Sequence, residues 1–506
     1  MSDFQPRYVR VNPLDNVGIV VNAGGVSAGA EFPGGIVLRE PIPQAHKLAL
    51  RPIAQGEAVL RYGQPIGVAL RSFDTGDYVR EIGPLEAPPL DSLSIATAVP
   101  PSLPPLEGFT FAGFRNPDGS VGTRNILGIT TTVQCVAPTV DFAVRRIRQE
   151  ILPQFPNVDD VCSITHTYGC GVAIDAPDAA IPIRTLQHIS EHANIGGSPL
   201  VISLGCEKLQ PARLFAGSEF PVLDNVIRMQ DEPGFAAMVA AIMRAAEKRL
   251  EILNKRQRVS CPASELIVGL QCGGSDAFSG VTCNPAVGFL ADLLVRAGAT
   301  VMFSEVSEVR DAVHLLTPRA MNHEVGIALI REMRWYDEYL ARGHADRSAN
   351  TTPGNKRGGL SNIIEKSLGS IAKAGSTALQ AVASHGEKVG RGKGLVFAAT
   401  PASDFICGTQ QLASMNMHVF TTGEGSPYGL SLVPVIKVSS RTALAEKWPD
   451  LIDFDAGGIA AGVFTIEQAG WKLFEQMLTV ASGKKTWSEQ WGLGNALAPF
   501  NPGPVT

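Results

Sequence analysis

The stretch QCGGSDAFSG, residues 271–280, brings together a thiol, a carboxylate, two hydroxyls and three glycines directly after the apolar run ELIVGL. A short apolar run bounded by glycine is typical of a buried strand, so these polar side chains fall where a strand ends. Ligands of an open parallel sheet bind beyond the carboxyl ends of its strands. We therefore predict a ligand-holding turn, in which backbone N–H groups and Ser275 bind substrate oxygens and Asp276 orients a catalytic partner. The backbone groups in question belong to Gly273 and Gly274.

Four other segments place Cys, His or carboxylate side chains at comparable positions. They are THTYGCGV (165–172), GCEKLQP (205–211), SEVSEVRD (304–311) and SDFICGTQ (403–410). A tight turn with a buried free thiol would explain any one of them. Together they favour a site that is assembled from several loops.

Two further loops are cationic. FRNPDGSVGTRN contains Arg115 and Arg124, and TPGNKRGGLSN contains Lys356 and Arg357. Because guanidinium groups bind carboxylates through two parallel hydrogen bonds, these loops suit a substrate that carries carboxylates. The alternative is a pair of solvated loops whose charges bind nothing specific.

Histidine is scarce, with nine residues in the chain, and His46 and His166 lie in the most unusual contexts. Either could be a metal ligand or a general base that titrates near neutral pH, although a structural role is the common one for a single histidine. The phosphate-binding pattern GxxxxGK[ST], the zinc-binding pattern HExxH and CxxC pairs are absent. Their absence disfavours nucleotide chemistry and a structural zinc site.

The composition is that of a globular protein with several domains. The chain has 506 residues, 45% hydrophobic and 18% charged, and a formal net charge of −5. It lacks the basic surface that neutralises nucleic-acid phosphates, and its longest apolar helical patch, FAAMVAAIM, is too short to span a bilayer. The eight cysteines form no dense framework, which favours free thiols. We expect a cytoplasmic protein that binds neither nucleic acid nor membrane.

The predicted elements divide the chain into three domains. Short strand-like runs separated by turns indicate a small all-β domain over residues 1–84. A proline-rich linker follows at 85–107. Alternating strand-like and helix-like segments then predict a central α/β domain at 108–257 and a C-terminal α/β domain at 258–506.

The clearest unit lies in the C-terminal domain. ELIVGL is followed by the helix-like PAVGFLADLLVRAG and then by ATVMFSE. This order predicts a strand, a crossover helix and a second, parallel strand. We therefore expect a Rossmann-like domain with a mainly parallel sheet.

Long strings that occur in a fixed order resemble the galactarate/altronate dehydratase family. They are GFRNPDGSVGTRNILGI, YGCGV, LGCEKLQP, ASELIVGLQCGGSDAFSGVT, NPAVG, ATVMFSEVSEVRDAVHLLTPRA, DRSANTTPGNKRGGLSNIIEKSLGSIAKAG, TPASDFICGTQQ and FNPGPVT. The first 90 residues resemble the SAF domain, a small β-clip module, with His46 and Lys47 at its recurrent His-Lys position. Altronate dehydratases carry histidines near the end of that module, where this chain has GDYVRE, so the resemblance favours the galactarate branch.

The resemblance implies a hydro-lyase that removes water from galactarate to give 5-dehydro-4-deoxy-D-glucarate. It also implies a divalent metal, Fe²⁺ in the first place, with Mn²⁺ or Ca²⁺ as possible substitutes. A base removes the proton alpha to a carboxylate, and an acid protonates the departing β-hydroxyl. The two cationic loops would then hold the two carboxylates of the substrate.

For acid–base chemistry we favour His166 with Tyr168, supported by Asp276 or Glu305. For the metal we favour His46, with Glu81 or Cys170 as further ligands. A metal bound at His46 would make the β domain a lid over the α/β site.

Other interpretations stay open. Three thiolates among four cysteines could hold a [4Fe–4S] cluster with one open iron; the four are Cys170, Cys206, Cys272 and Cys407. The substrate could be altronate or glucarate, or the protein could bind a sugar acid without turning it over. Titratable residues in glycine-rich turns favour an enzyme. A homodimer is the expected assembly.

Overall fold

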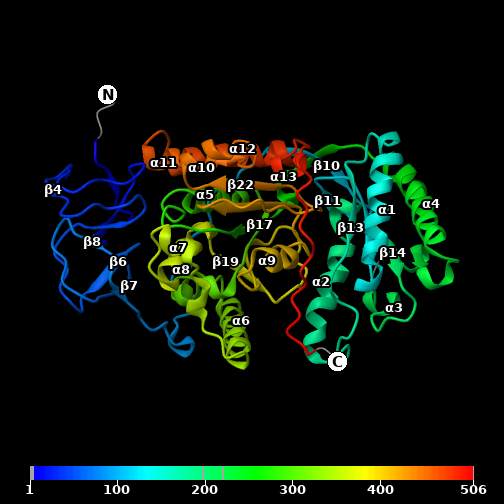
Figure 1. The fold of residues 1–506 in the computed structure, drawn as a ribbon, viewed down its shortest axis with the longest axis horizontal. Coiled ribbons are helices and arrows are strands. Elements are labelled where there is room, and N and C mark those ends of the chain that lie inside the picture. The colour runs from blue at the N-terminus through cyan, green and yellow to red at the C-terminus, as the bar shows by residue number, and fades with distance from the viewer. Residues whose placement is uncertain (1–4, 197–198, 219–221, 505–506) are drawn as a thin grey trace.

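The computed structural model describes residues 5–196, 199–218 and 222–504. Figure 1 shows an elongated molecule, with an N-terminal β domain at one end, a central α/β domain at the other, and a C-terminal α/β domain between them. The chain therefore has to pass the C-terminal domain to reach the central one. The predicted division into one β domain and two α/β domains is confirmed.

The N-terminal domain is built from short antiparallel strands. Its sheets have the orders β1-β2-β5-β8 and β6-β7-β9, beside the hairpin β3-β4. The strands are β1 (Tyr8–Val9), β2 (Val17–Val20), β3 (Glu31–Phe32), β4 (Ile36–Val37), β5 (Lys47–Ala49), β6 (Ala58–Arg61), β7 (Gln64–Ala69), β8 (Tyr78–Val79) and β9 (Ile82–Gly83). Val20, Phe32 and Leu48 contribute to a buried core between them. The predicted all-β domain is thus confirmed.

The proline-rich segment 85–107 lies along the C-terminal domain. Its backbone N–H groups at Ala96 and Ala98 donate to the carbonyls of Thr317 and Pro318, both at 2.9 Å. Prolines keep the segment extended, because they remove backbone donors and hold φ near −65°. The linker is therefore a strap with a defined path.

The central domain contains a parallel sheet of order β13-β12-β14-β15. Its strands are β12 (Ile126–Thr131), β13 (Asp160–Ile164), β14 (Leu200–Ser203) and β15 (Val226–Arg228). Its helices are α1 (Ala137–Glu150), α2 (Ala180–Ser190), α3 (Pro211–Leu214) and α4 (Phe235–Leu253). Helices α1 and α4 pack against each other and share a core with the sheet. A separate antiparallel sheet, β11-β10-β16, joins the start of the domain to its end; the strands are β10 (Thr110–Arg115), β11 (Val121–Gly122) and β16 (Val259–Pro262).

The C-terminal domain is built on a seven-stranded sheet of order β19-β20-β18-β17-β21-β22-β23, in which every neighbouring pair is parallel. Its strands are β17 (Ile267–Cys272), β18 (Thr300–Phe303), β19 (Leu379–Ala383), β20 (Gly394–Ala398), β21 (Met417–Thr422), β22 (Val435–Ser439) and β23 (Phe454–Asp455). Strand β17, at the centre, is buried along its whole length, as expected for a parallel sheet covered on both faces.

Helices cover this sheet on both sides. They are α5 (Cys283–Arg296), α6 (His323–Arg342), α7 (Pro353–Arg357), α8 (Ile363–Ile371), α9 (Asp404–Gln411), α10 (Thr442–Lys447), α11 (Gly458–Ala461), α12 (Ile466–Ala481) and α13 (Trp487–Gln490). Helix α12 packs on α5, and Figure 1 shows α12 and α9 on opposite sides of the strands. The predicted strand, helix and parallel strand are confirmed as β17, α5 and β18.

One predicted loop is a helix. Residues 403–410 were expected to form a ligand-binding loop, but Asp404–Gln411 form α9. The helix buries Cys407, and Gln411 donates to the carbonyl of Leu270 in β17 at 3.1 Å. Tertiary packing therefore outweighs the turn-like composition of this segment.

Two general expectations can be checked on the described residues. None of the helices found there is long and apolar enough to cross a bilayer. All eight cysteines are free, as predicted, with five buried and three exposed.

Candidate functional site

Three acidic or thiol side chains meet where two neighbouring parallel strands end. Cys272 is the last residue of β17, whereas Glu305 and Glu308 follow β18. The Cys272 Sγ lies 3.2 Å from Glu308 Oε2 and 3.6 Å from Glu305 Oε2. The three ligand atoms all lie within 4.8 Å of one another, and all three residues are buried. This group could hold a metal ion, since it combines two carboxylate oxygens with a sulfur.

The backbone at Glu305 is unusual and holds the group together. Glu305 has φ = 75°, in the left-handed region that few residues other than glycine adopt. Its N–H donates to Thr400 Oγ1 at 3.0 Å, and its carboxylate accepts the N–H of Cys272 at 3.3 Å. Such strain persists only where the surroundings enforce it, and it is concentrated at functional sites.

Two lysines accompany the two carboxylates. Lys373 Nζ lies 3.0 Å from Glu305 Oε2, and Lys366 Nζ lies 2.7 Å from Glu308 Oε1. Both lysines come from α8 and the turn that follows it, and both are at most 9% exposed. Buried charges require such partners, because desolvation of an unpaired ion is costly.

Burial and mutual repulsion shift the ionisation of this group. Burial, with the charge of Glu308 second, raises the pKa of Glu305 to about 7. Burial also raises the pKa of Glu308, but Lys366 and Lys373 outweigh it and hold that pKa below its ordinary value. Burial next to both carboxylates raises the pKa of the Cys272 thiol. A bound cation would relieve this repulsion and would favour the thiolate.

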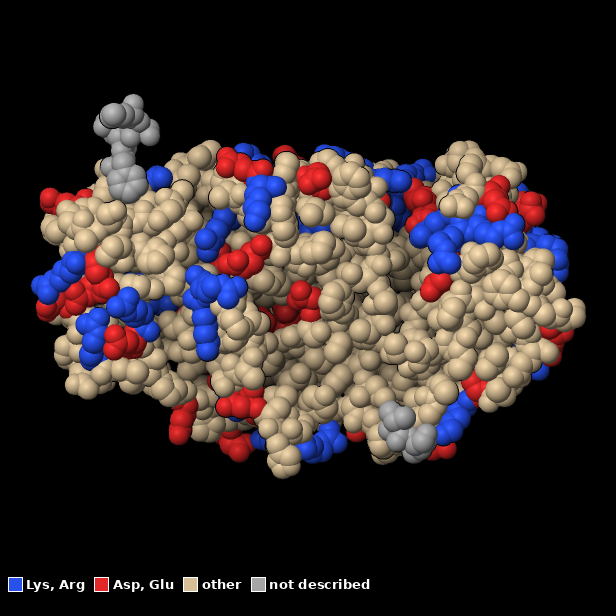
Figure 2. Space-filling view, in the orientation of Figure 1, with Lys and Arg blue, Asp and Glu red and all other residues tan. Residues whose placement is uncertain are grey.

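Asp404, the first residue of helix α9, is a further carboxylate near this group. Burial and then the charge of Glu308 raise the pKa of Asp404 to about 6. Its carboxylate lies against Gly273, where an added Cβ would stand 2.5 Å from Asp404 Oδ2. Glycine at this position therefore allows the carboxylate to approach the end of β17. Figure 2 shows acidic side chains recessed in a hollow in the middle of this face, in the region of α7 and α9 of Figure 1.

The carboxylate of Asp276 stabilises the 271–280 turn by accepting hydrogen bonds from side chains and backbone of the protein. Its Oδ1 accepts from the Ser279 N–H at 2.7 Å and from the Ser279 hydroxyl at 2.8 Å, and its Oδ2 accepts from Arg441 Nε at 2.5 Å. A Cβ at Gly423 or Gly358 would collide with this side chain. Asp276 therefore contacts Ser279 and Arg441, and its role in orienting a catalytic partner stays a prediction.

Gly273 and Gly274 were predicted to donate their backbone N–H groups to the substrate, but the N–H of Gly273 already has an acceptor within the protein. Gly273 donates its N–H to Thr421 O at 3.0 Å, and the carbonyl of Gly274 accepts from Gly423 and Glu424. Ser275 lines a narrow cavity whose enclosed part is about 10 Å³, room for roughly one water. The cavity wall joins the 271–280 turn, α8 and the β domain; it includes Tyr62, Cys272, Asp276, Ser279, Asn284, Leu360, Glu365, Lys366 and Ser370.

The β domain closes this cavity through a buried ionic contact. Lys47 Nζ lies 2.8 Å from Glu365 Oε2 and donates to Gly359 O at 2.7 Å. Arg61 binds the other carboxylate oxygen of Glu365 and donates to Ala277 O at 2.6 Å. Burial alone would raise the pKa of Glu365, but Lys47 and Arg61 outweigh it and lower that pKa to about 2. The β domain is thus a wall of the cavity.

His166 and Tyr168 lie in the central domain. His166 is buried, its Nε2 bonds to Thr131 O at 2.8 Å, and its Nδ1 accepts the N–H of Tyr168 at 3.1 Å. Burial lowers the pKa of His166 to about 4 and raises that of Tyr168. With both ring nitrogens engaged, this histidine has a structural position. Among the described residues, no hydrogen bond or ion pair joins His166 or Tyr168 to Asp276 or Glu305.

The structure does not gather the three predicted metal ligands. His46 Nδ1 bonds to the Tyr78 hydroxyl at 2.5 Å and Nε2 to Arg357 O at 3.1 Å. Glu81 is exposed and pairs with Arg71 at 3.0 Å. Cys170 belongs to the central domain. Within the described residues, the group that could hold a metal is instead Cys272, Glu305 and Glu308.

The cationic side chains of the two loops differ in their contacts within the protein. All five N–H groups of Arg124 are used, by Glu489 and by the carbonyls of Thr123, Val480 and Lys484. This arginine therefore joins two domains and has no donor left for a substrate, contrary to the expectation. Arg115 is exposed and lies 3.5 Å from Glu265.

Lys356 and Arg357, on α7, remain candidates for substrate binding. Both are exposed, and they directly precede Gly358, which packs against Asp276. The two residues therefore stand beside the 271–280 turn, where a charged substrate could reach them.

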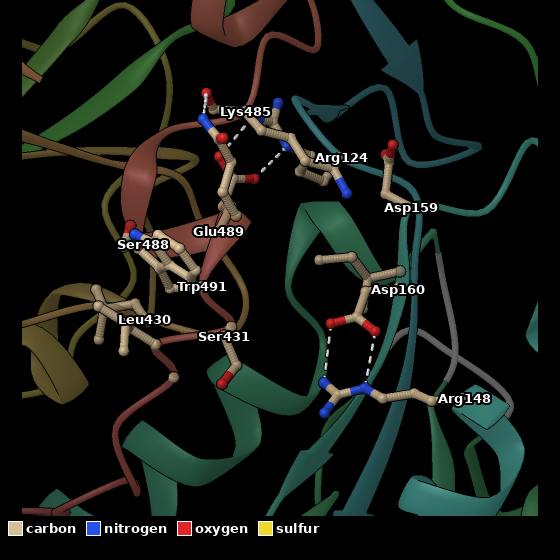
Figure 3. A pocket seen from close by; sticks show the side chains of 15 residues that line it. Arg124, Arg148, Asp159, Asp160, Leu430, Ser431, Lys485, Ser488, Glu489 and Trp491 are labelled. Carbon is tan, nitrogen blue, oxygen red and sulfur yellow. Dashed lines mark hydrogen bonds and ion pairs between the residues drawn. The ribbon is translucent and has the colours of Figure 1, made fainter. Parts of the chain in front are cut away.

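A more spacious cavity than the one beside Cys272 lies elsewhere. It measures about 410 Å³ and separates the central domain from the C-terminal segment around α13 (Figure 3). Arg148 and Asp160 pair across two contacts of 2.8 Å there, and Arg124 pairs with Glu489. Both of these arginines are already neutralised by carboxylates of the protein. We therefore favour the smaller cavity beside Cys272 as the candidate substrate site.

Sequence reasoning missed Glu308, Lys366, Lys373 and Asp404 as site residues. A signal was present in IIEKSLGSIAKAG, where charged residues interrupt an otherwise apolar helix. Lys366 lies on α8 and Lys373 in the turn that follows it, and the structure turns both side chains inward.

Comparison with known proteins agrees with this architecture. Three family models match: the altronate/galactarate dehydratase SAF domain (residues 6–82), the second domain of D-galactarate dehydratase/altronate hydrolase (113–254), and the C-terminal domain of D-galactarate/altronate dehydratase (263–505). The chain is 58% identical to galactarate dehydratase (L-threo-forming) of Escherichia coli over 99% of this chain and 97% of that protein. It is 32% identical to altronate dehydratase of Bacillus subtilis over 94% and 95%, respectively. It is 29% identical to the beta subunit of (2R)-sulfolactate sulfo-lyase of Chromohalobacter salexigens over 76% and 96%.

Proposed function

Since the chain belongs to the D-galactarate/altronate dehydratase family, we propose that it is a hydro-lyase that converts galactarate to 5-dehydro-4-deoxy-D-glucarate and water. The observation that carries the choice of substrate is the 58% identity to a galactarate dehydratase, against 32% to an altronate dehydratase of similar coverage. The buried group of carboxylates, lysines and a thiol beside the 271–280 turn supports the choice of chemistry.

The reaction moves one proton and one hydroxyl group. The proton alpha to a carboxylate leaves its carbon, the hydroxyl on the neighbouring carbon leaves as water after gaining a proton, and the resulting enol tautomerises to a ketone. The chain must therefore stabilise negative charge on the carboxylate, transfer protons and hold two carboxylate ends.

In this proposal Cys272, Glu305 and Glu308 hold a divalent metal, with Fe²⁺ as the first choice, since the group offers both hard and soft donors. A metal in this position would act as a Lewis acid toward an oxygen of the substrate.

Lys366 supplies fixed positive charge in the cavity wall. Burial lowers the pKa of Lys366, but Glu308 outweighs it and keeps the ammonium group charged. We assign proton transfer to Asp404, because its carboxyl group lies beside Gly273 and titrates close to neutral pH. Lys356 and Arg357, both exposed on α7, are assigned to a carboxylate end of the substrate.

The enclosed cavity is too small for a six-carbon diacid, because it holds roughly one water. Substrate binding therefore requires a wall to move. The β domain contributes Tyr62 to one wall of this cavity, which is consistent with the lid predicted from the sequence.

The decisive experiment is anaerobic turnover by the purified protein, with and without Fe²⁺, against galactarate, altronate and glucarate separately, with keto-acid formation followed by NMR. We expect metal-dependent product from galactarate. Turnover of altronate or glucarate alone would reassign the substrate, and tight binding without turnover would identify a sugar-acid binding protein.

Light scattering of the same sample tests the homodimer that we propose as the assembly.

A further inference from the structure

Three exposed thiols occupy one edge of the central domain. Cys135, Cys170 and Cys206 are exposed, whereas the other five cysteines are buried. They follow β12, β13 and β14, which are neighbouring parallel strands. Because parallel strands place their carboxyl ends at the same edge, cysteines from three distant segments meet there. Cys170 and Cys206 lie close enough to Cys135 that both, after burial, raise the pKa of its thiol.

A buried carboxylate ties the first of these loops to the third. Glu207 accepts the Ser203 hydroxyl at 2.5 Å and the Gly205 N–H at 2.6 Å, and it also accepts the hydroxyl of Thr132. Thr132 precedes Cys135, and Glu207 is next to Cys206. These contacts fix the two loops relative to each other.

His166 ties the first loop to the second. Its ring bonds to the carbonyl of Thr131 and accepts the N–H of Tyr168, and the carbonyl of Tyr168 in turn accepts the N–H of Gln134 at 3.2 Å. Gly169 has φ = 97°, and a Cβ there would collide with Thr132 O. The three thiols are therefore held on a preorganised frame, which a metal site requires.

The spacing of the sulfurs favours a group larger than one ion. Among the described residues, three ligand atoms of His, Cys, Asp or Glu all lie within 4.8 Å of one another only in the group of Cys272, Glu305 and Glu308. A single tetrahedral ion with metal–sulfur bonds of about 2.3 Å needs sulfurs about 4 Å apart. The three thiols do not meet this condition, since their sulfur atoms do not all lie within 4.8 Å of one another. Thiolate ligands select zinc or iron–sulfur clusters.

We propose that Cys135, Cys170 and Cys206 are the ligands of a [4Fe–4S] cluster, in which one iron has no protein ligand. This open iron would face solvent at the edge of the sheet and could bind an oxygen ligand. The site is distinct from the Cys272 group, and it does not depend on the proposed galactarate chemistry. It also differs from the four cysteines considered from the sequence, because Cys272 and Cys407 are buried in the C-terminal domain.

The test is anaerobic reconstitution of the full-length protein with Fe²⁺, sulfide and a thiol reductant, followed by desalting. Iron and acid-labile sulfide are then measured per chain, together with visible absorption and the EPR spectrum after reduction. We expect about four of each per wild-type chain. C135S, C170S and C206S should each lose most of the sulfide and of the visible absorption, while circular dichroism stays unchanged.

The matched control is C272S, which removes the thiol of the other candidate metal centre. It should retain the sulfide and the visible absorption. Iron without sulfide, a single zinc ion, a Cys135–Cys170 disulfide, or equal sulfide in wild type and triple variant would each overturn the cluster. Because these readouts do not include activity, they are separable from a failure of the proposed dehydration.

Discussion

Lys47 of the β domain and Glu365 at the start of α8 form an ion pair of 2.8 Å in which both side chains are at most 2% exposed. Arg61 binds the second oxygen of the same carboxylate, so one carboxylate joins two strands of the β domain to the wall of the candidate active site. A buried charge of this kind is tolerated only while its partners are in place. The contact therefore holds the β domain against this wall.

Removal of this carboxylate should loosen the β domain. We expect E365Q to lower the free energy of unfolding by about 3 kcal/mol, because Lys47 and Arg61 would stay buried without their partner. Urea unfolding measures the loss, and limited proteolysis in the 85–107 strap reports detachment. E57Q is the control, since Glu57 pairs with Arg51 on the surface of the same domain and should contribute less than about 1 kcal/mol. Equal losses in the two variants would refute a special role for Glu365.

The same contact predicts an acid dependence. Lys47 and Arg61 hold the pKa of Glu365 at about 2 against an ordinary value of 4.5, so its stabilisation is fully present above pH 4.5. It is lost as the pH falls from 4.5 toward 2, because in this range the carboxylate is protonated in the unfolded state but stays ionised in the folded state. Urea midpoints of wild type and E365Q should differ most near neutral pH and converge below pH 3. A constant difference over this range would contradict the assignment.

Arg357 and Arg124 were both predicted to bind a substrate carboxylate, but substitution of Arg357 should change KM and substitution of Arg124 should change stability. R357A should raise the KM for galactarate about 10-fold with little effect on thermal stability, because the side chain is exposed beside the site. R124M should leave KM unchanged and reduce stability by about 3 kcal/mol, because all five donors of Arg124 join domains. Steady-state kinetics measures the KM of both variants, and thermal melts measure their stability. An increased KM in R124M would show that Arg124 binds the substrate after all.

The metal assignment can be tested by metal titration. E308Q should weaken Fe²⁺ binding about 100-fold, as expected when a ligand or its close support is lost. Calorimetry under anaerobic conditions measures the affinity independently of turnover. Glu332 is a buried carboxylate outside the group, so E332Q should bind the metal like the wild type. Unchanged affinity in E308Q would remove Glu308 from the centre.

Asp404 provides the test of proton transfer. D404N should lower kcat at least 100-fold with KM and metal content nearly unchanged, because an amide cannot exchange the proton. Asp453 is the matched control, since burial also raises the pKa of Asp453 to about 6 but its carboxylate accepts backbone N–H groups of Lys437 and Trp487. D453N should keep its kcat and lose stability. If both variants retain kcat, proton transfer belongs to another residue.

Local patterns were sufficient for the division into one β domain and two α/β domains and for the central strand–helix–strand unit of the C-terminal domain. Alternation and apolar runs predicted the β domain and the unit of β17, α5 and β18, because these patterns reflect the faces that each element buries. The end of β17 was predicted as a ligand site for the same reason. Segment 403–410 was missed as helix α9, since its packing against β17 depends on residues far away in the chain.

The sequence by itself determined the family, the order of domains and the loops that carry reactive side chains, because these depend on residue types and their local spacing. Only the tertiary structure decided which of those side chains meet. It engaged both nitrogens of His166, used all the donors of Arg124, and brought Glu308, Lys366 and Lys373 to Cys272. The physical reason is that burial and pairing of charge depend on contacts between distant segments, and no local pattern encodes them.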